Sequence, residues 1–264
     1  MSDQEAKVLA IEVLRFLGME AEELPCKETE TADIHAWGLQ CDVFLEIKTK
    51  SDDQSRLAEL ATSENTESVL WQVDPIAART AFNTHLRKAE KQLAASATSA
   101  DAFRFAFLWL RGRDPDLLWR QAFETFFGRA DLGAPGAREC VTCFYFDHSS
   151  CFSCPGIDGM FLVEVDTRGV GLHLCLNEYS PRYEAIRTSA LVEAIKQIGF
   201  RVFDPYEMED NGEIVAYRGN LSRSDHDGIL AELSKSHGAE YRLAPKLNRH
   251  RPWFRGGEDA EAAT

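Results

Sequence analysis

Two acidic residues and a lysine are spaced so that they can share one chemical site. Asp33 opens an apolar run, and Glu46 and Lys48 lie two residues apart in the alternating run Asp42–Lys50. Because residues i and i+2 of a strand share a face, Glu46 and Lys48 project together, while Ile47 packs into the core with its carbonyl at the edge of the site. Two carboxylates and a carbonyl are oxygen ligands that suit Mg²⁺. An ammonium group beside them can activate a water or offset phosphate charge, so the pattern predicts phosphodiester hydrolysis.

A β-hairpin is needed to bring these residues together. The runs Ala32–Trp37 and Asp42–Lys50 predict its two strands and place Asp33 beside Glu46. Asp42 is a competing carboxylate because it shares the Glu46 face, but it lies about 13 Å along the strand. The alternative interpretation of the Glu-x-Lys triplet is an exposed ion pair on an edge strand, which contributes about 0–1 kcal/mol to stability.

Helices are expected before and after this hairpin in the chain. Apolar residues at helical spacing predict one over residues 5–18 and another over Ile76–Ala95, followed by a buried strand over Phe103–Leu110. The second helix carries a polar line that includes Lys88 and Gln92 beside its apolar stripe. These two side chains are candidates to contact a phosphate, and the alternative is an ordinary solvated helix face.

This order of elements resembles the PD-(D/E)xK nuclease superfamily, the restriction-endonuclease-like fold that includes archaeal Holliday-junction resolvases and Mrr-type restriction enzymes. The resemblance rests on the first helix, on Thr31-Ala32-Asp33-Ile34 and on Leu45-Glu46-Ile47-Lys48-Thr49-Lys50, and covers roughly the first 110 residues. It implies a DNA endonuclease of restriction, phage defence or repair. It also implies that Asp33, Glu46 and the carbonyl of Ile47 hold Mg²⁺ or Mn²⁺, and that Lys48 serves the nucleophilic water.

The chain departs from the family pattern at two positions. Ala32 stands at the position of the proline in the PD-(D/E)xK motif, and many members of the superfamily also lack this proline. Many members also carry an acid on the first helix, about three turns before its terminal glycine, and here that position is Lys7. Glu5 or Glu12 can supply this carboxylate only if the helix has a different register.

Strands and helices intermix along the whole chain, which predicts an α/β (α+β) fold with a mixed central β-sheet flanked by helices. A stretch rich in glycine and proline at 133–136 marks a break. We therefore expect a nuclease-like core over 1–128, a strand-rich sheet extension or specificity subdomain over 129–240, and a basic then acidic tail over 241–264. Beyond the break, the patterns predict strands over Cys140–Phe146, Met160–Val165, Gly171–Leu176 and Phe200–Phe203, and helices over Ser189–Ile198 and Asp225–His237.

Two cysteine pairs form a second motif with chemical meaning. Cys140, Cys143, Cys151 and Cys154 follow a CxxC-x7-CxxC pattern, formally that of a four-thiolate Zn²⁺ site. The short spacer would require a very tight hairpin, and Phe144-Tyr145-Phe146 within it is typical of a core strand. Buried thiols are therefore the alternative, because cysteine packs well as a small hydrophobe.

The segment Tyr241–Gly257 is basic in an otherwise acidic chain. It carries five positive charges and no acid, interleaved with Trp253 and Phe254. This asymmetry predicts an arm that contacts phosphates, with Arg249 and Arg251 as candidates. The alternative is a tail that is solvated or lies on the protein's own acidic surface.

Composition limits the partners and the compartment. The chain has 264 residues, 43 of them acidic and 29 basic, for a formal charge of −14. This balance argues against broad, non-specific adhesion to nucleic acid but leaves room for a local basic groove. No apolar stretch approaches about 20 residues, and no signal-peptide pattern is present, so we expect a cytoplasmic protein without a membrane partner. DNA is the expected partner, and a homodimer would suit cleavage of both strands.

Three functions from different classes follow from these observations. The first is a metal-dependent deoxyribonuclease. The second is a catalytically inactive nuclease-like module that binds nucleic acid or a protein, which Lys7 and the net charge favour. The third is a zinc-stabilised interaction protein in which the Glu-x-Lys triplet is accidental. A Glu46→Gln change separates the first two, because binding should survive it and cleavage should not.

Overall fold

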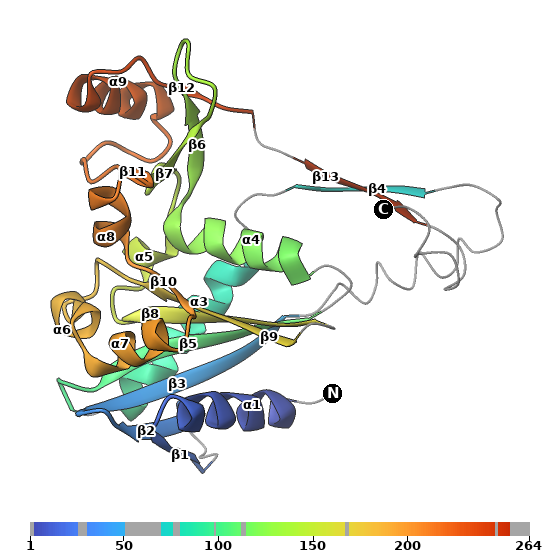
Figure 1. The fold of residues 1–264 in the computed structure, drawn as a ribbon, viewed down its shortest axis with the longest axis vertical. Helices are drawn as coiled ribbons and strands as arrows, with labels where there is room; N and C mark the ends of the chain where they lie inside the picture. Colours follow the sequence, from blue (N-terminus) through green and yellow to red (C-terminus); the bar gives the residue numbers. More distant parts are fainter. Residues whose placement is uncertain are drawn as a thin grey trace.

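The computed structural model describes residues 3–25, 31–50, 70–75, 80–97, 99–111, 115–166, 169–245 and 248–253. Its largest element is a mixed seven-stranded sheet in the order β1-β2-β3-β5-β8-β9-β10 (Figure 1). The mixed α/β class expected from the sequence is confirmed. The strands are β1 (Glu20–Glu23), β2 (Ile34–Gly38), β3 (Cys41–Lys50), β5 (Phe103–Leu110), β8 (Gly159–Asp166), β9 (Gly169–Leu176) and β10 (Arg201–Phe203).

The first three strands form an antiparallel meander, and β5 then adds in parallel to β3. The predicted hairpin is confirmed, with Ile34 opposite Leu45 and Gly38 opposite Cys41. Its turn holds Leu39 and Gln40 at φ values of 48° and 61°, a left-handed conformation that non-glycine residues rarely adopt. This turn fixes the register, and a slip of one residue would move every side chain of β3 to the opposite face.

Helices cover both faces of the large sheet. The helices α1 (Asp3–Phe16), α6 (Tyr183–Arg187) and α7 (Ala190–Gln197) share one hydrophobic cluster with the inward residues of the sheet. A second cluster on the opposite face contains residues of α3 (Thr80–Ser96), α4 (Pro115–Phe127) and α5 (Ser150–Ser153). In Figure 1, α1 and α4 accordingly lie on opposite sides of the sheet. None of the helices in the described ranges combines the length and apolar character that a membrane crossing requires.

The alternation of β3 decides which residues face each layer. Val43, Leu45 and Ile47 are buried in the cluster that contains α1. Glu46 and Lys48 therefore project to the other face, toward α3. Over Val43–Leu45 the strand pairs with β2 on one side and with β5 on the other, whereas Glu46 and Lys48 lie beyond the last β2 pair and are flanked by β5 alone.

Strands from the second half of the chain belong to both a large and a small sheet. β8, β9 and β10 continue the seven-stranded sheet, so strands on both sides of residue 128 share it. A separate four-stranded sheet has the order β11-β7-β6-β12, and α9 packs on it. The strands of this sheet are β6 (Ala130–Gly133), β7 (Val141–Phe144), β11 (Ile214–Ala216) and β12 (Arg242–Leu243). The helices near it are α8 (Pro205–Asp210), which contacts β11, and α9 (His226–His237).

Two segments differ from what the sequence predicts. Residues 20–23, for which the sequence pattern predicts neither helix nor strand, form the edge strand β1, in which Ala21 is the one buried residue. The basic segment, expected as a tail, contributes β12 to the small sheet and β13 (Asn248–Trp253) to a ribbon with β4 (Leu70–Pro75). Residues 254–264, like the polar stretch 51–68, lie outside the described residues.

Candidate functional site

The hairpin brings Asp33 to the middle of β3. Asp33 lies immediately before β2, and its backbone N–H donates a hydrogen bond to the carbonyl of Leu45 at 3.0 Å. Its carboxylate atom Oδ2 accepts a hydrogen bond of 2.9 Å from the backbone N–H of Ile47. The Asp33 side chain is therefore fixed against the same part of β3 that carries Glu46 and Lys48.

Glu46 and Lys48 contact each other on the face of β3 that α3 covers. Lys48 Nζ lies 2.5 Å from Glu46 Oε1, and it also donates to Gln92 Oε1 at 3.1 Å. Only 2% of the Glu46 side chain is exposed, against 18% for Lys48. The structure thus brings together Asp33, Glu46 and Lys48 as the sequence predicted. Because the Glu46 carboxylate is buried, the Glu46–Lys48 ion pair is not the exposed pair of the alternative interpretation.

The carboxyl group of Glu46 has a strongly shifted pKa. Burial raises the pKa of its carboxyl to about 7, an effect that Asp33 reinforces and the Lys48 ammonium opposes. Its Oε2 atom is buried and has no hydrogen-bond partner. A buried carboxylate oxygen without a partner costs free energy unless a ligand or cation completes it.

The helix α3 supplies a support for Lys48. Gln92 accepts from the Lys48 ammonium, and its own Nε2 donates to the carbonyl of Thr31 at 3.3 Å. Gln92 therefore positions Lys48 and is not free to act only as a phosphate contact. Lys88 is exposed on the same helix. Burial lowers the pKa of His85, and the nearby ammonium groups of Lys48, Lys50 and Lys88 lower it further.

Lys7 is the site residue whose role the sequence did not indicate. Its ammonium reaches from α1 to Asp33 Oδ1 at 2.9 Å and to Glu23 Oε1 at 2.8 Å. Burial acts to lower the pKa of Lys7, but the hydrogen bonds that it donates to Glu23 and Asp33 outweigh this and raise the pKa above its ordinary value. The other candidates on this helix lie elsewhere: Glu5 faces Arg111 at 3.9 Å, and Glu12 is exposed.

The donor set of this site fits a hard divalent cation. Asp33, Glu46 and the carbonyl of Ile47 offer oxygen atoms, and the unpartnered Oε2 of Glu46 is one that a cation would complete. Across the ranges that the structure describes, no three His, Cys, Asp or Glu side chains are grouped so that they could hold a metal. Two carboxylates from the protein would therefore leave several positions to water, as Mg²⁺ ordinarily accepts.

The structure does not gather the four cysteines into a zinc site. Cys143 is buried in the cluster of the small sheet, where its Sγ donates to the carbonyl of Phe144, while Cys140 is exposed. Cys151 and Cys154 lie in the cluster beneath α3 and α4. Burial raises the pKa of Cys143 and of Cys154 to about 12, so these thiols stay protonated. They are packed as small apolar side chains.

The basic candidates of the C-terminal segment are paired in the β4–β13 ribbon. Arg249 lies opposite Asp74 and Arg251 opposite Gln72 in the antiparallel register. The side chains of both arginines lie outside what the structure describes. Their contact with nucleic acid stays a prediction.

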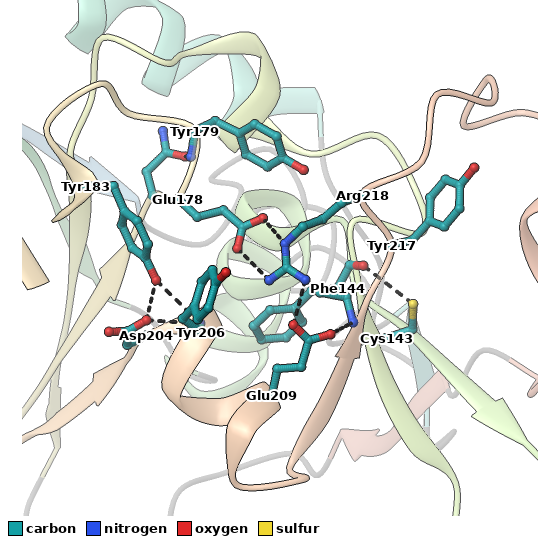
Figure 2. Close-up of polar contacts among 12 residues, drawn as sticks. Cys143, Phe144, Glu178, Tyr179, Tyr183, Asp204, Tyr206, Glu209, Tyr217 and Arg218 are labelled. Carbon is teal, nitrogen blue, oxygen red and sulfur yellow. Dashed lines mark hydrogen bonds and ion pairs between the residues drawn. The ribbon is translucent and has the colours of Figure 1, made fainter. Parts of the chain in front are cut away.

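A second polar cluster joins the segments after β9 and β11 to α8 (Figure 2). Arg218 follows β11, and its guanidinium donates to both carboxylate oxygens of Glu178 at 2.9 Å and to Glu209 of α8 at 2.6 Å. Burial raises the pKa of Glu178, and Arg218 opposes this rise. Beside it, the Tyr183 hydroxyl donates to Asp204 (Figure 2). These contacts join segments that no sequence motif connected, because the partners lie up to 40 residues apart.

The open cleft of about 710 Å³ lies at the opposite end of β3 and β5. Its walls include Gln40, Asp42, Asp101, Arg182 and Ser189. Arg182 is already held by Asp158 at 2.9 Å, and the walls mix acidic and neutral groups. The cleft therefore presents no set of groups with a defined chemistry, unlike the site around Glu46.

We compared the chain with family models, with curated proteins and with solved structures. No family model, no curated protein and no solved structure matches it.

Proposed function

We propose that the protein is a nuclease that depends on a divalent cation and hydrolyses phosphodiester bonds in DNA, with Asp33, Glu46 and Lys48 in its active site. The observation that carries this proposal is the buried Glu46 carboxylate, whose Oε2 has no partner although it lies beside a second carboxylate and an ammonium. A purely structural pair would be expected to satisfy both oxygens.

The arrangement of elements also supports the proposal. The helix, the hairpin, the second helix and the next strand that carry the resemblance are α1, β2–β3, α3 and β5. They lie together, with the hairpin between the two helices. Asp33 and Glu46 come from adjacent strands, and Gln92 comes from α3.

Each side chain has a role that follows from its contacts. Asp33, Glu46 and the carbonyl of Ile47 would hold Mg²⁺ or Mn²⁺, which when bound supplies positive charge to stabilise the transition state of phosphoryl transfer. Lys48 orients the attacking water and offsets phosphate charge. Its ammonium has three N–H donors, of which Glu46 and Gln92 accept two and one remains. Gln92 positions Lys48 through its second bond to Thr31.

One observation favours a second function, a nuclease-like module that binds nucleic acid or protein without cleaving. Lys7 pairs with Asp33 at 2.9 Å, so Asp33, like Glu46 with Lys48, already has a cationic partner. In a binding module this pair would be permanent, and the acidic residues would serve only the fold. The two functions differ in whether Asp33 becomes available to a cation.

The test is cleavage of supercoiled, linear and single-stranded DNA with Mg²⁺ or Mn²⁺, with Lys48→Ala and EDTA as controls. The nuclease proposal expects cleavage by the wild type that disappears in the variant and with EDTA. Cleavage that persists in Lys48→Ala would place the activity elsewhere. No cleavage by folded protein, with DNA binding that survives Glu46→Gln, would establish the binding module instead.

A further inference from the structure

The charges around the candidate site are nearly balanced before any cation binds. Asp33 holds the ammonium of Lys7 at 2.9 Å, and Glu46 holds that of Lys48 at 2.5 Å. Two carboxylates thus face two ammonium groups, and Glu23 adds one further negative charge next to Lys7. A divalent cation entering this site meets little net negative charge.

We propose that Lys7 sets the affinity of the site for divalent cations, holding it low until a nucleic-acid phosphate is present. This inference rests on the proposed function and deepens it, since it names the residue that couples cation binding to substrate binding. It predicts that the free protein binds Mn²⁺ weakly and that DNA and the cation strengthen each other's binding.

The reason is electrostatic. Lys7 shares Asp33 with the incoming cation, so the two positive charges come within a few ångströms of each other, where salt screens them poorly. A phosphate in the site adds negative charge that attracts both. Because only 18% of the Lys7 side chain is exposed, solvent does little to weaken this repulsion.

Glu23 is a second ion-pair partner of Lys7. Its Oε1 lies 2.8 Å from the Lys7 ammonium, and its Oε2 accepts from Gln4 at 3.0 Å, which fixes the carboxylate. Lys7 can therefore release Asp33 and keep one ion pair instead of becoming an isolated charge. The exchange between Asp33 and a phosphate needs only a small movement of a flexible side chain.

The experiment measures Mn²⁺ binding by isothermal titration calorimetry in the chain of 264 residues. The variants are Lys7→Met, which removes the charge, and Lys7→Gln, which keeps a hydrogen-bond donor without charge. Lys196→Met on α7 is the matched control, because Lys196 also forms an ion pair, with Glu207 at 2.6 Å, outside the site. Circular dichroism confirms that each variant is folded.

Both Lys7 variants are expected to bind Mn²⁺ about tenfold more tightly than the wild type, and Lys196→Met to bind it equally. If the wild type binds Mn²⁺ and Glu46→Gln abolishes binding, but the Lys7 variants bind no more tightly, the role of Lys7 is wrong and the nuclease site stands. A gain in Lys7→Met alone, or an equal gain in Lys196→Met, also overturns it. If no Mn²⁺ binding depends on Glu46, the proposed function and the inference fail together.

A second arm tests the coupling directly. Lys48→Ala prevents cleavage, so Mn²⁺ can be titrated in this background with and without a DNA duplex. DNA should strengthen Mn²⁺ binding more when Lys7 is present than in the double variant with Lys7→Met, and the difference is the coupling. An equal effect of DNA in the two proteins would contradict the proposal.

Discussion

Two buried glutamates in this protein receive cationic partners of different shape. Glu178, with 7% of its side chain exposed, pairs with the Arg218 guanidinium, which donates to both carboxylate oxygens. Glu46, with 2% exposed, pairs with the Lys48 ammonium through Oε1 alone, and its Oε2 has no partner. Burial raises the pKa of both carboxyl groups, for Glu46 to about 7.

The difference separates a pair that holds the fold from one that is open to a ligand. A guanidinium matches the two oxygens of a carboxylate, whereas an ammonium is a point charge that leaves the second oxygen to another partner. The uncompensated oxygen of Glu46 destabilises the folded state, and a cation or substrate can recover that energy. The same residue type therefore serves stability at one place and is suited to chemistry at the other.

Breaking the structural pair should have the largest effect on stability. Arg218→Met leaves Glu178 buried without its partner and should lower the free energy of unfolding by about 3 kcal/mol, as measured by urea denaturation. Arg218→Lys should recover only part of this loss, because an ammonium cannot bond both oxygens. A loss below about 0.5 kcal/mol would mean that the pair behaves as an exposed one.

The pH dependence of stability should distinguish the two glutamates. The folded pKa of Glu46, about 7, lies above the ordinary value of 4.5, so between these pH values the folded state keeps a proton that the unfolded state has lost. The contribution of Glu46 to stability therefore falls as pH rises through this window, by about 3 kcal/mol in all. Glu46→Gln cannot ionise and should lose this dependence.

The measurement is urea unfolding at pH 5 and pH 8, with EDTA present throughout. The free energy of unfolding of Glu46→Gln, taken relative to that of the wild type, should be higher at pH 8 than at pH 5. Glu178→Gln is the contrasting variant, and we expect it to destabilise at both pH values because it removes the charge that Arg218 pairs with. Parallel pH profiles for the wild type and Glu46→Gln would refute the perturbed state of Glu46.

A cation should stabilise the wild type through Glu46. At a free Mn²⁺ concentration ten times the dissociation constant, mass action adds about 1.4 kcal/mol to the free energy of unfolding. Chelation with EDTA should reverse the gain, and thermal denaturation can follow both changes. Glu178→Gln should keep the Mn²⁺ response and Glu46→Gln should lose it, whereas the opposite result would invert the roles assigned to the two residues.

The smallest effect is expected from the support of Lys48. Gln92→Leu removes one hydrogen bond to Lys48 and one to Thr31, and should cost about 1 kcal/mol of stability. Cleavage should fall about fivefold because Lys48 is less well positioned. Lys91→Leu, at the exposed neighbouring position of α3, should leave both quantities unchanged. Cleavage by Gln92→Leu at the wild-type rate would remove Gln92 from the site.

The hairpin and the Glu-x-Lys face could be predicted because the determining signal is local. Alternation along Asp42–Lys50 specifies which side chains share a face, and the antiparallel register then places Asp33 beside them. The edge strand β1 was missed because Ala21 is its one inward residue and the others are glutamates, which give no alternating pattern. Strand pairing with β2, a tertiary contact, decides its structure.

The contacts of Lys7 and Arg218 could not be predicted, because they depend on how distant elements pack. Lys7 reaches Asp33 because α1 lies across β2 and β3, and no residue pattern specifies that crossing. The cysteine spacing left a zinc cluster and buried thiols open as alternatives. In the structure Phe144 and Tyr145 enter the core, and Cys143 and Cys151 are buried in different hydrophobic clusters.

The position of β3 inside the sheet has a consequence for how the candidate site responds to heating. Its backbone pairs with both β2 and β5 over Val43–Leu45 and with β5 alone over Glu46–Lys50, and α1 and α3 cover its two faces. Paired segments covered on both faces exchange their amide hydrogens only when a large part of the fold opens. Release of Glu46 and Lys48 from the candidate site should therefore require the loss of the pairing with β5, which amide exchange along Glu46–Lys50 can follow on heating.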